Sequence, residues 1–90
     1  MRLRYGPRAL ADLERLHSFV AEKDPAAADR IRRRLLAGIS ALIEQPGLGR
    51  ALDKGRPIRQ WTAGEHVLHY VVRHDEEVLV LRIWHGREDR

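Results

Sequence analysis

The chain contains no cysteine and, among its 90 residues, only one phenylalanine and one methionine. Without cysteine it can have neither a disulfide framework nor a thiolate zinc site. Its longest apolar run, Val78-Leu79-Val80-Leu81, is far shorter than the roughly 20 residues of a membrane-spanning helix. The opening Met1-Arg2-Leu3-Arg4-Tyr5 lacks the apolar core of a signal peptide. We therefore expect a cytoplasmic protein without membrane contact.

Positive charge is in excess. Lys and Arg number 17 against 13 Asp and Glu, which gives a formal net charge of +4 and a pI near 10.3. All but two of these cations are arginine, whose planar guanidinium suits bidentate contact with carboxylate or phosphate. This balance favours an acidic partner, either nucleic acid or an acidic protein segment. With 43% hydrophobic residues the chain can form a core, and its length predicts one domain over residues 1–90.

Residue patterning in the first half predicts a short strand and two helices. Residues 2–5 alternate charged and apolar side chains, which is typical of an edge strand. Apolar residues then recur at helical spacing from residue 8 to about residue 22. Asp24-Pro25 predicts a second helix start, with Asp24 as the N-cap. This helix, extending to about residue 44, carries an apolar arc of about 140°, so we expect it to contact both the first helix and a sheet.

The second half has strand periodicity after a glycine-rich loop over residues 46–55. A strand is predicted over residues 58–62, with Pro57 at its start or edge. Residues 66–73 are apolar on both faces and predict a central strand, joined by a tight turn to a last strand over residues 78–84. The predicted fold class is therefore α+β, in the order β-α-α-β-β-β. A helical hairpin packs on one face of a small, mostly antiparallel sheet.

Three histidines invite two interpretations. His66 and His69 would face opposite sides of their strand, whereas His85 could approach the central strand from the next one. Acid–base chemistry is one interpretation, and hydrogen bonding at the strand ends is the favoured alternative. No metal site is expected, because neither a His-x₃-His motif nor a cysteine pair is present. No cofactor is expected either, because the glycines do not form a phosphate-binding motif.

The second predicted helix carries a group of arginines on its outer face: Arg30, Arg33 and Arg34. This group is either a basic stripe for an acidic partner or an ordinary solvated helix face. Arg32 instead projects into the apolar arc, so it must pair, extend its charge to solvent or meet a partner. Asp12 on the first helix is a candidate structural partner for Arg32.

Trp61, Tyr70 and Trp84 supply most of the aromatic content. They could stack nucleic-acid bases, but core packing is the favoured interpretation. Trp84 is the expected exception, because it ends its strand beside His85 and Arg87.

Several pieces of sequence carry a resemblance that covers nearly the whole chain. They are, in order, Ala11-Asp12-Leu13, Asp24-Pro25-Ala26-Ala27-Ala28, Gln45-Pro46-Gly47-Leu48-Gly49-Arg50, Arg59, His69-Tyr70-Val71-Val72 and His85-Gly86-Arg87. Their order and spacing resemble the RelE/ParE superfamily of bacterial type II toxins, and its ParE branch best.

The resemblance implies one of two activities. RelE-like members cut messenger RNA on the ribosome, using basic residues on the sheet and a C-terminal tyrosine. ParE-like members poison DNA gyrase by trapping its cleaved DNA complex, and they are associated with plasmid stabilisation. In both branches a cognate antitoxin wraps the toxin with an acidic and apolar C-terminal segment; a ParD-like antitoxin is implied here.

The chain departs from the nuclease pattern. The family's third-strand arginine falls at Val67, and the expected C-terminal tyrosine would lie beyond Arg90. The remaining candidate groups for ribonuclease chemistry are Arg87, His85, Arg59 and Lys54. Phosphodiester cleavage needs a base, a cation and an acid, so we assign no catalytic residue and do not expect an enzyme.

We therefore expect a ParE-like gyrase poison whose contact with DNA, if any, is indirect. The candidate target contacts are His85, Arg87, Arg82, Trp84 and Arg59. The candidate antitoxin contacts are Arg30, Arg32, Arg33, Arg34, Pro57 and Trp61. A basic surface and an exposed strand edge over residues 57–62 would suit an acidic helix and an added strand. The alternatives are a ribosome-dependent mRNA endoribonuclease and an inactive relative that still binds an antitoxin.

Overall fold

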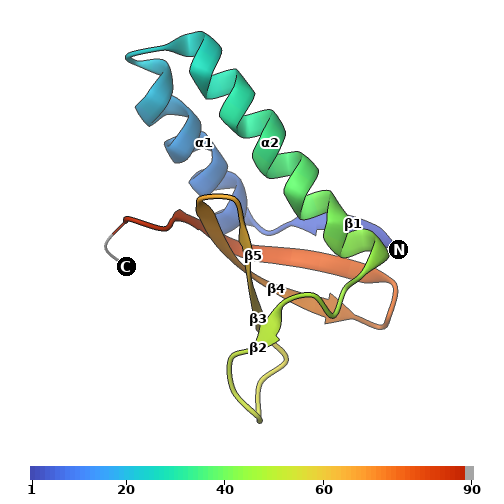
Figure 1. Ribbon diagram of the computed structural model, residues 1–90. Helices are drawn as coiled ribbons and strands as arrows, with labels where there is room; N and C mark the ends of the chain where they lie inside the picture. Colours follow the sequence, from blue (N-terminus) through green and yellow to red (C-terminus); the bar gives the residue numbers. More distant parts are fainter. Residues whose placement is uncertain (89–90) are drawn as a thin grey trace.

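A helical hairpin packs against a five-stranded sheet in the computed structural model, which describes residues 1–88 (Figure 1). The elements are β1 (Arg2–Tyr5), α1 (Pro7–Ala21), α2 (Pro25–Glu44), β2 (Arg50–Ala51), β3 (Arg59–Ala63), β4 (His66–Arg73) and β5 (Glu77–His85). The strand order is β1-β5-β4-β3-β2, with β1 parallel to β5 and the other pairs antiparallel. The α+β class and the position of the hairpin on the sheet confirm the prediction.

The helix boundaries follow from the residues that start and stop them. Proline occupies the first turn of both helices, where its missing N–H costs no hydrogen bond. The predicted cap is confirmed, because the Asp24 side chain accepts a hydrogen bond from the Ala27 N–H at 3.1 Å. Within residues 1–88 neither helix has the length and hydropathy that crossing a membrane requires.

The short strand β2 lies inside the stretch that sequence patterning predicted as loop. It pairs with the first half of β3, through Arg50 with Gln60 and Ala51 with Arg59. Two residues carry no detectable period, so the pattern could not have predicted this strand. The exposed edge predicted over residues 57–62 is therefore wrong at Arg59 and Gln60, which β2 covers. In the described sheet β2 has no register partner for Trp61–Ala63.

The core lies between the hairpin and the sheet. Its largest fully buried side chains are Ile39 and Leu42 from α2 and Leu68, Tyr70, Val78, Val80 and Ile83 from the sheet. The pairing of β4 with β5 shifts by one residue between His69 and Tyr70. Tyr70 pairs with Val80 and Leu68 with Ile83, so the extra residue on β5 lets both Val80 and Ile83 point into the core. The shift thereby leaves His69 and Arg82, which are register partners, on the opposite face.

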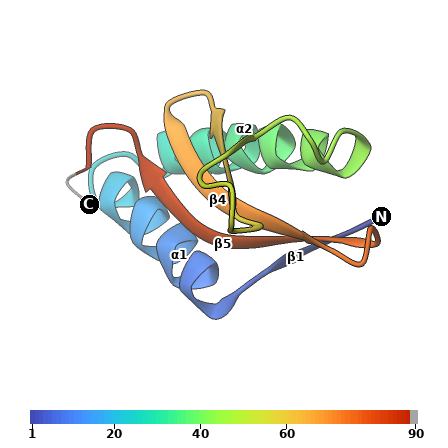
Figure 2. The same ribbon diagram turned by 90° about the horizontal axis from the view of Figure 1, so that it is seen from below.

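The hairpin does not cover the sheet evenly. Seen from below, α1 runs beside β5 and α2 lies beyond β4 (Figure 2). Because β1 pairs only with Glu77–Val80, the last part of β5 has no strand neighbour on that side, and α1 takes that place. The chain between β2 and β3 projects from the sheet at the end far from the helical turn (Figure 1).

Candidate functional site

A hollow of about 500 Å³ opens beside the hairpin tip, the end of the helical hairpin at the turn between α1 and α2 (residues 22–24). There the hairpin tip meets the β3–β4 turn and the residues after β5. Its apolar wall is formed by Leu16, Phe19 and Val20 of α1 and Ile31 of α2. Its polar rim is formed by Arg15, Glu65, His66, His85, Arg87 and Glu88. Phe19 is 70% exposed and Ile31 37% exposed. Exposed apolar side chains that gather at a concave site are typical of a binding surface.

Asp12 holds the part of β5 that β1 does not cover. Its buried carboxylate accepts hydrogen bonds from the Ile83 N–H and from Arg82 Nε, both at 2.8 Å, and from Arg15 at 3.2 Å. Burial alone would raise the pKa of the Asp12 carboxyl, but these hydrogen bonds together hold it below its ordinary value. The expectation that Asp12 partners Arg32 is therefore wrong, because Asp12 faces the edge of β5 and Arg32 is exposed on α2.

The same network fixes one side of the hollow. Arg15 pairs with Glu88 as well as with Asp12, and Glu88 accepts a hydrogen bond from the His85 N–H at 2.9 Å. The turn after β5 is thereby joined to α1, although the two segments lie more than 60 residues apart in sequence. Its position depends on charge pairing as well as on the sheet.

His66 and His85 form a second contact at the rim. They are register partners on β4 and β5, with ring centroids 5.4 Å apart in an edge-to-face arrangement. Burial lowers the pKa of His66, and the neighbouring His85 lowers it further. His85 Nδ1 accepts the Arg87 N–H at 3.1 Å, and its Nε2 lies 3.4 Å from the Glu65 carboxylate. His85 thus stabilises the turn that carries Arg87.

The sheet face away from the hairpin carries a separate cluster. Arg82 lies over the Trp84 ring at 5.2 Å, and His69 meets the same ring edge-to-face at 4.6 Å. His69 Nε2 is also 2.9 Å from the Gln60 side-chain oxygen. His66 and His69 therefore face opposite sides of β4, as their spacing predicts. Of Trp61, Tyr70 and Trp84, the last is the one that lies outside the core cluster.

A third set of contacts fixes the chain between α2 and β2. The Tyr70 hydroxyl, which is buried, donates to the Pro46 carbonyl at 2.6 Å and accepts the Gly49 N–H at 2.9 Å. Arg59 donates to the Gly49 carbonyl at 2.6 Å. A Cβ on Gly49 would lie 2.7 Å from the Tyr70 ring, so this close approach requires glycine. Tyr70 and the half-buried Trp61 pack in or against the core, as predicted.

The candidate target contacts do not share one surface. His85 and Arg87 line the hollow, whereas Arg82 and Trp84 lie on the open sheet face. Arg59 lies on neither surface, because its guanidinium donates to the Gly49 carbonyl just before β2.

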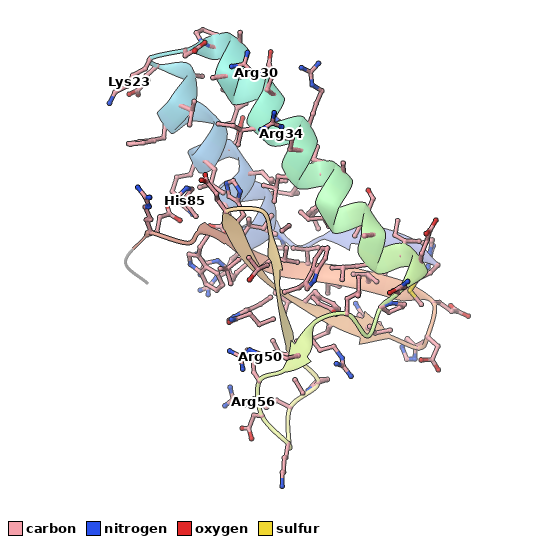
Figure 3. All side chains as sticks on the ribbon, viewed as in Figure 1. Lys23, Arg30, Arg34, Arg50, Arg56 and His85 are labelled. Atoms are coloured by element: carbon pink, nitrogen blue, oxygen red, sulfur yellow. The ribbon has the colours of Figure 1, made fainter. Side chains whose placement is uncertain are left out.

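The candidate antitoxin contacts are divided as well. Arg30, Arg32, Arg33 and Arg34 are all exposed on α2, near the hairpin tip, where Figure 3 labels Arg30 and Arg34. Pro57 and Trp61 belong to a different part of the chain, before and within β3. Three residues at the hollow were not predicted from the sequence: Arg15, Phe19 and Glu88. Phe19 alone had a signal, since it is an aromatic residue outside the apolar stripe of its helix. Within residues 1–88 there is no cluster of His, Asp and Glu able to hold a metal ion.

Comparison with known proteins gives agreeing results at the level of family. Residues 3–90 match the sequence model of the family described as ParE toxin of type II toxin-antitoxin system, parDE. Toxin RelE1 of Caulobacter vibrioides is 37% identical over 86 residues, which cover 92% of this chain and 90% of that protein. Toxin ParE1 of Mycobacterium tuberculosis is 33% identical over 85 residues, which cover 92% of this chain and 87% of that protein.

Solved structures share the fold. A chain of the chromosomal ParDE TA system from P. aeruginosa aligns with a TM-score of 0.79 at 21% identity, covering 94% of this chain and 95% of the other. A chain of the toxin-antitoxin complex RelBE2 from Mycobacterium tuberculosis aligns with a TM-score of 0.66 at 20% identity, covering 93% and 95%. At these identities the likeness shows a common architecture.

Proposed function

The chain belongs to the ParE toxin family of type II toxin–antitoxin systems, within the RelE/ParE superfamily, and from this premise we propose that it poisons DNA gyrase by binding. The toxin engages the gyrase–DNA complex after strand cleavage, prevents religation and stops replication. A cognate ParD-like antitoxin neutralises it. The solved structures that share its fold come from toxin–antitoxin systems, which supports an antitoxin as partner.

One observation carries the choice of binding over bond chemistry: Arg59 of β3 and Arg82 of β5 are both engaged in structural contacts. Arg82 is held by Asp12, and Arg59 by the Gly49 carbonyl. The half-exposed Val67 stands where the resemblance implies a catalytic arginine. RNA cleavage would need a base, a cation and an acid converging on one phosphate. The engagement of these groups supports a toxin that acts as a ligand.

The lining of the hollow supports an antitoxin that binds there through an amphipathic acidic segment. Apolar side chains of such a segment would fill the space beside Phe19 and Ile31. Its carboxylates would reach Arg34, which lies one helical turn beyond Ile31 on α2, and Arg87 at the rim. Arg87, expected from the sequence to contact the target, is thus assigned to the antitoxin. A segment that folds only on binding would wrap this surface without needing a stable free structure.

A cleavage assay with purified gyrase tests the target. The toxin should convert supercoiled plasmid to linear DNA when the reaction is stopped with detergent and protease, and prior addition of the antitoxin should abolish this. An unchanged plasmid would contradict the proposal.

The second candidate, a ribosome-dependent ribonuclease, is favoured by the 37% identity to a protein named RelE1. Codon-spaced cuts in translated messenger RNA, with gyrase turnover unaffected, would establish it in place of gyrase poisoning. If neither assay gives a product, the third interpretation remains, an inactive relative that still binds an antitoxin.

A further inference from the structure

The projecting chain between β2 and β3 forms a second basic surface, far from the hairpin tip. Figure 3 labels Arg50 and Arg56 at this end and Lys23, Arg30 and Arg34 at the other. Residues 50–56, here termed the basic loop, contain Arg50, Lys54 and Arg56 against one acid, Asp53. All three cations are exposed, and none of the ion pairs found within residues 1–88 uses them. Their charge is therefore available to a partner.

Two backbone hydrogen bonds support the basic loop. The Leu52 N–H donates to the Ile58 carbonyl at 3.2 Å, and the Arg56 N–H donates to the Asp53 carbonyl at 3.3 Å. At its base, the Tyr70 hydroxyl and the Arg59 guanidinium both hold Gly49, the residue before Arg50. The cations thus project from a preorganised support, which lowers the entropy lost when they bind.

The surroundings of the loop distinguish its partner from that of the α2 arginines. The α2 arginines adjoin an apolar hollow, whereas the exposed Leu48 before the basic loop and Leu52 within it are not part of that hollow. Residues 46–58 contain no aromatic side chain on which an unpaired base could stack. Recognition of single-stranded RNA relies on such stacking, whereas duplex phosphates need only positioned cations.

We propose that the basic loop contacts the sugar–phosphate backbone of double-stranded DNA through Arg50, Lys54 and Arg56. This inference replaces the indirect DNA contact expected from sequence with a direct one. It rests on the proposed function for its choice of DNA, because a toxin bound to the gyrase–DNA complex meets a duplex there. The contact is independent of base sequence, since only phosphates are engaged.

Binding of the purified toxin to a short fluorescent duplex, followed by anisotropy between about 50 and 200 mM salt, tests the inference. Three phosphate contacts predict a slope of about −2.7 in log K against log salt, or about 40-fold weaker binding across that range. The double variant Lys54→Ala/Arg56→Ala should reduce the slope by about 2. The matched control, Arg33→Ala/Arg34→Ala, removes the same charge from α2 and should leave the slope unchanged.

The variant Tyr70→Phe tests the hydrogen bonds that support the basic loop without changing the charge of the loop. It keeps every cation, so the salt slope should stay the same while affinity falls several-fold, because a looser loop loses more entropy on binding. Circular dichroism would establish that the variant remains folded. An affinity equal to that of the unaltered protein would contradict the role given to preorganisation.

Three results would overturn the DNA contact: no binding at about 50 mM salt, an equal loss of slope in both double variants, or loop-dependent binding of single-stranded RNA or polyglutamate in preference to the duplex. The outcome is separable from that of the proposed function. Gyrase trapping without duplex binding would contradict only the loop contact, whereas loop-dependent duplex binding without trapping would contradict only the gyrase target.

Discussion

The two basic ends of this protein carry similar charge in different surroundings. At the hairpin end, Arg30 and Arg34 lie near an apolar hollow whose rim is built by charge pairs between α1 and the turn after β5. At the loop end, Arg50 and Arg56 stand on backbone bonds anchored by a buried phenol. Their positive charge alone does not distinguish the two ends. This difference is the basis for the two proposed partners, an acidic, partly apolar protein segment at the hairpin and a phosphate backbone at the loop.

The ends also differ in what would disrupt them. The rim of the hollow depends on Asp12 and Arg15, which join segments distant in sequence. The loop depends on neutral hydrogen bonds to Tyr70, with Arg59 supporting the same glycine. Substitutions in one set should therefore leave the other end intact.

The largest expected effect comes from Asp12→Ala at the hairpin end. It leaves the Ile83 N–H and the Arg82 guanidinium without their acceptor, and it should lower the free energy of unfolding by about 3 kcal/mol. Urea unfolding would measure this loss. Asp29→Ala, which removes an exposed acid from α2, is the control and should cost no more than about 0.5 kcal/mol. A loss below about 1 kcal/mol for Asp12→Ala would contradict the role given to this carboxylate.

The Asp12 network also has a pH signature. Because the folded state lowers the pKa of this carboxyl, its stabilisation is fully present above the unfolded value of about 3.9 and is lost as pH falls through the folded pKa. The stability difference between the unaltered protein and Asp12→Asn should therefore be constant near neutral pH and shrink below about pH 4. A constant difference down to about pH 2 would show that the charge of Asp12 contributes nothing.

Next in size is the effect of Phe19→Ala on antitoxin affinity. The side chain is 70% exposed, so its loss should barely change stability, but removing an aromatic residue from the wall of the hollow should weaken antitoxin binding by about tenfold or more. Isothermal titration with the antitoxin would measure this. Leu10→Ala is the matched control, because Leu10 is 53% exposed on the same helix outside the hollow. Equal losses for the two variants would remove the hollow from the interface.

At the loop end, Tyr70→Phe should lower the free energy of unfolding by about 1–2 kcal/mol. The change removes the only hydroxyl that bridges Pro46 and Gly49 and leaves both backbone groups without that partner. Hydrogen exchange should show the Gly49 amide losing protection while the Ile83 amide keeps it. Loss of protection at both amides would mean that the two ends are coupled, which would contradict their independence.

The smallest effect concerns His66. Its folded pKa is lowered, mainly by burial, so the unfolded chain binds a proton more readily and stability should fall as pH drops below about 6.5. His66→Gln should flatten the stability profile in that window by under about 1 kcal/mol. Thermal unfolding from neutral to mildly acidic pH would measure it, and a profile unchanged by the substitution would assign the pH dependence to other groups.

The hairpin and the paired strands β4 and β5 were predictable because their apolar residues repeat over many positions. The Asp24 cap and the opposite orientations of His66 and His69 follow from local geometry in the same way. β2 could not be predicted, because two residues have no period and its pairing depends on a loop anchored by Tyr70.

The surfaces were harder to predict than the elements. A helical wheel places Asp12 on the inner side of α1 but does not say that the edge of β5, rather than Arg32, lies opposite. The hollow joins residues of α1 and α2 to residues after β5, and only the tertiary arrangement brings these together. Charge composition predicts an acidic partner class but gives no division of the positive charge into two ends.

The central claim, that this toxin acts by binding and performs no cleavage of its own, is tested most directly by one paired measurement. Purified toxin is added to gyrase with supercoiled plasmid and, in parallel, to a translating ribosome system with labelled messenger RNA. We expect linear plasmid that depends on gyrase, together with intact messenger RNA. Cut messenger RNA beside normal gyrase turnover would contradict it.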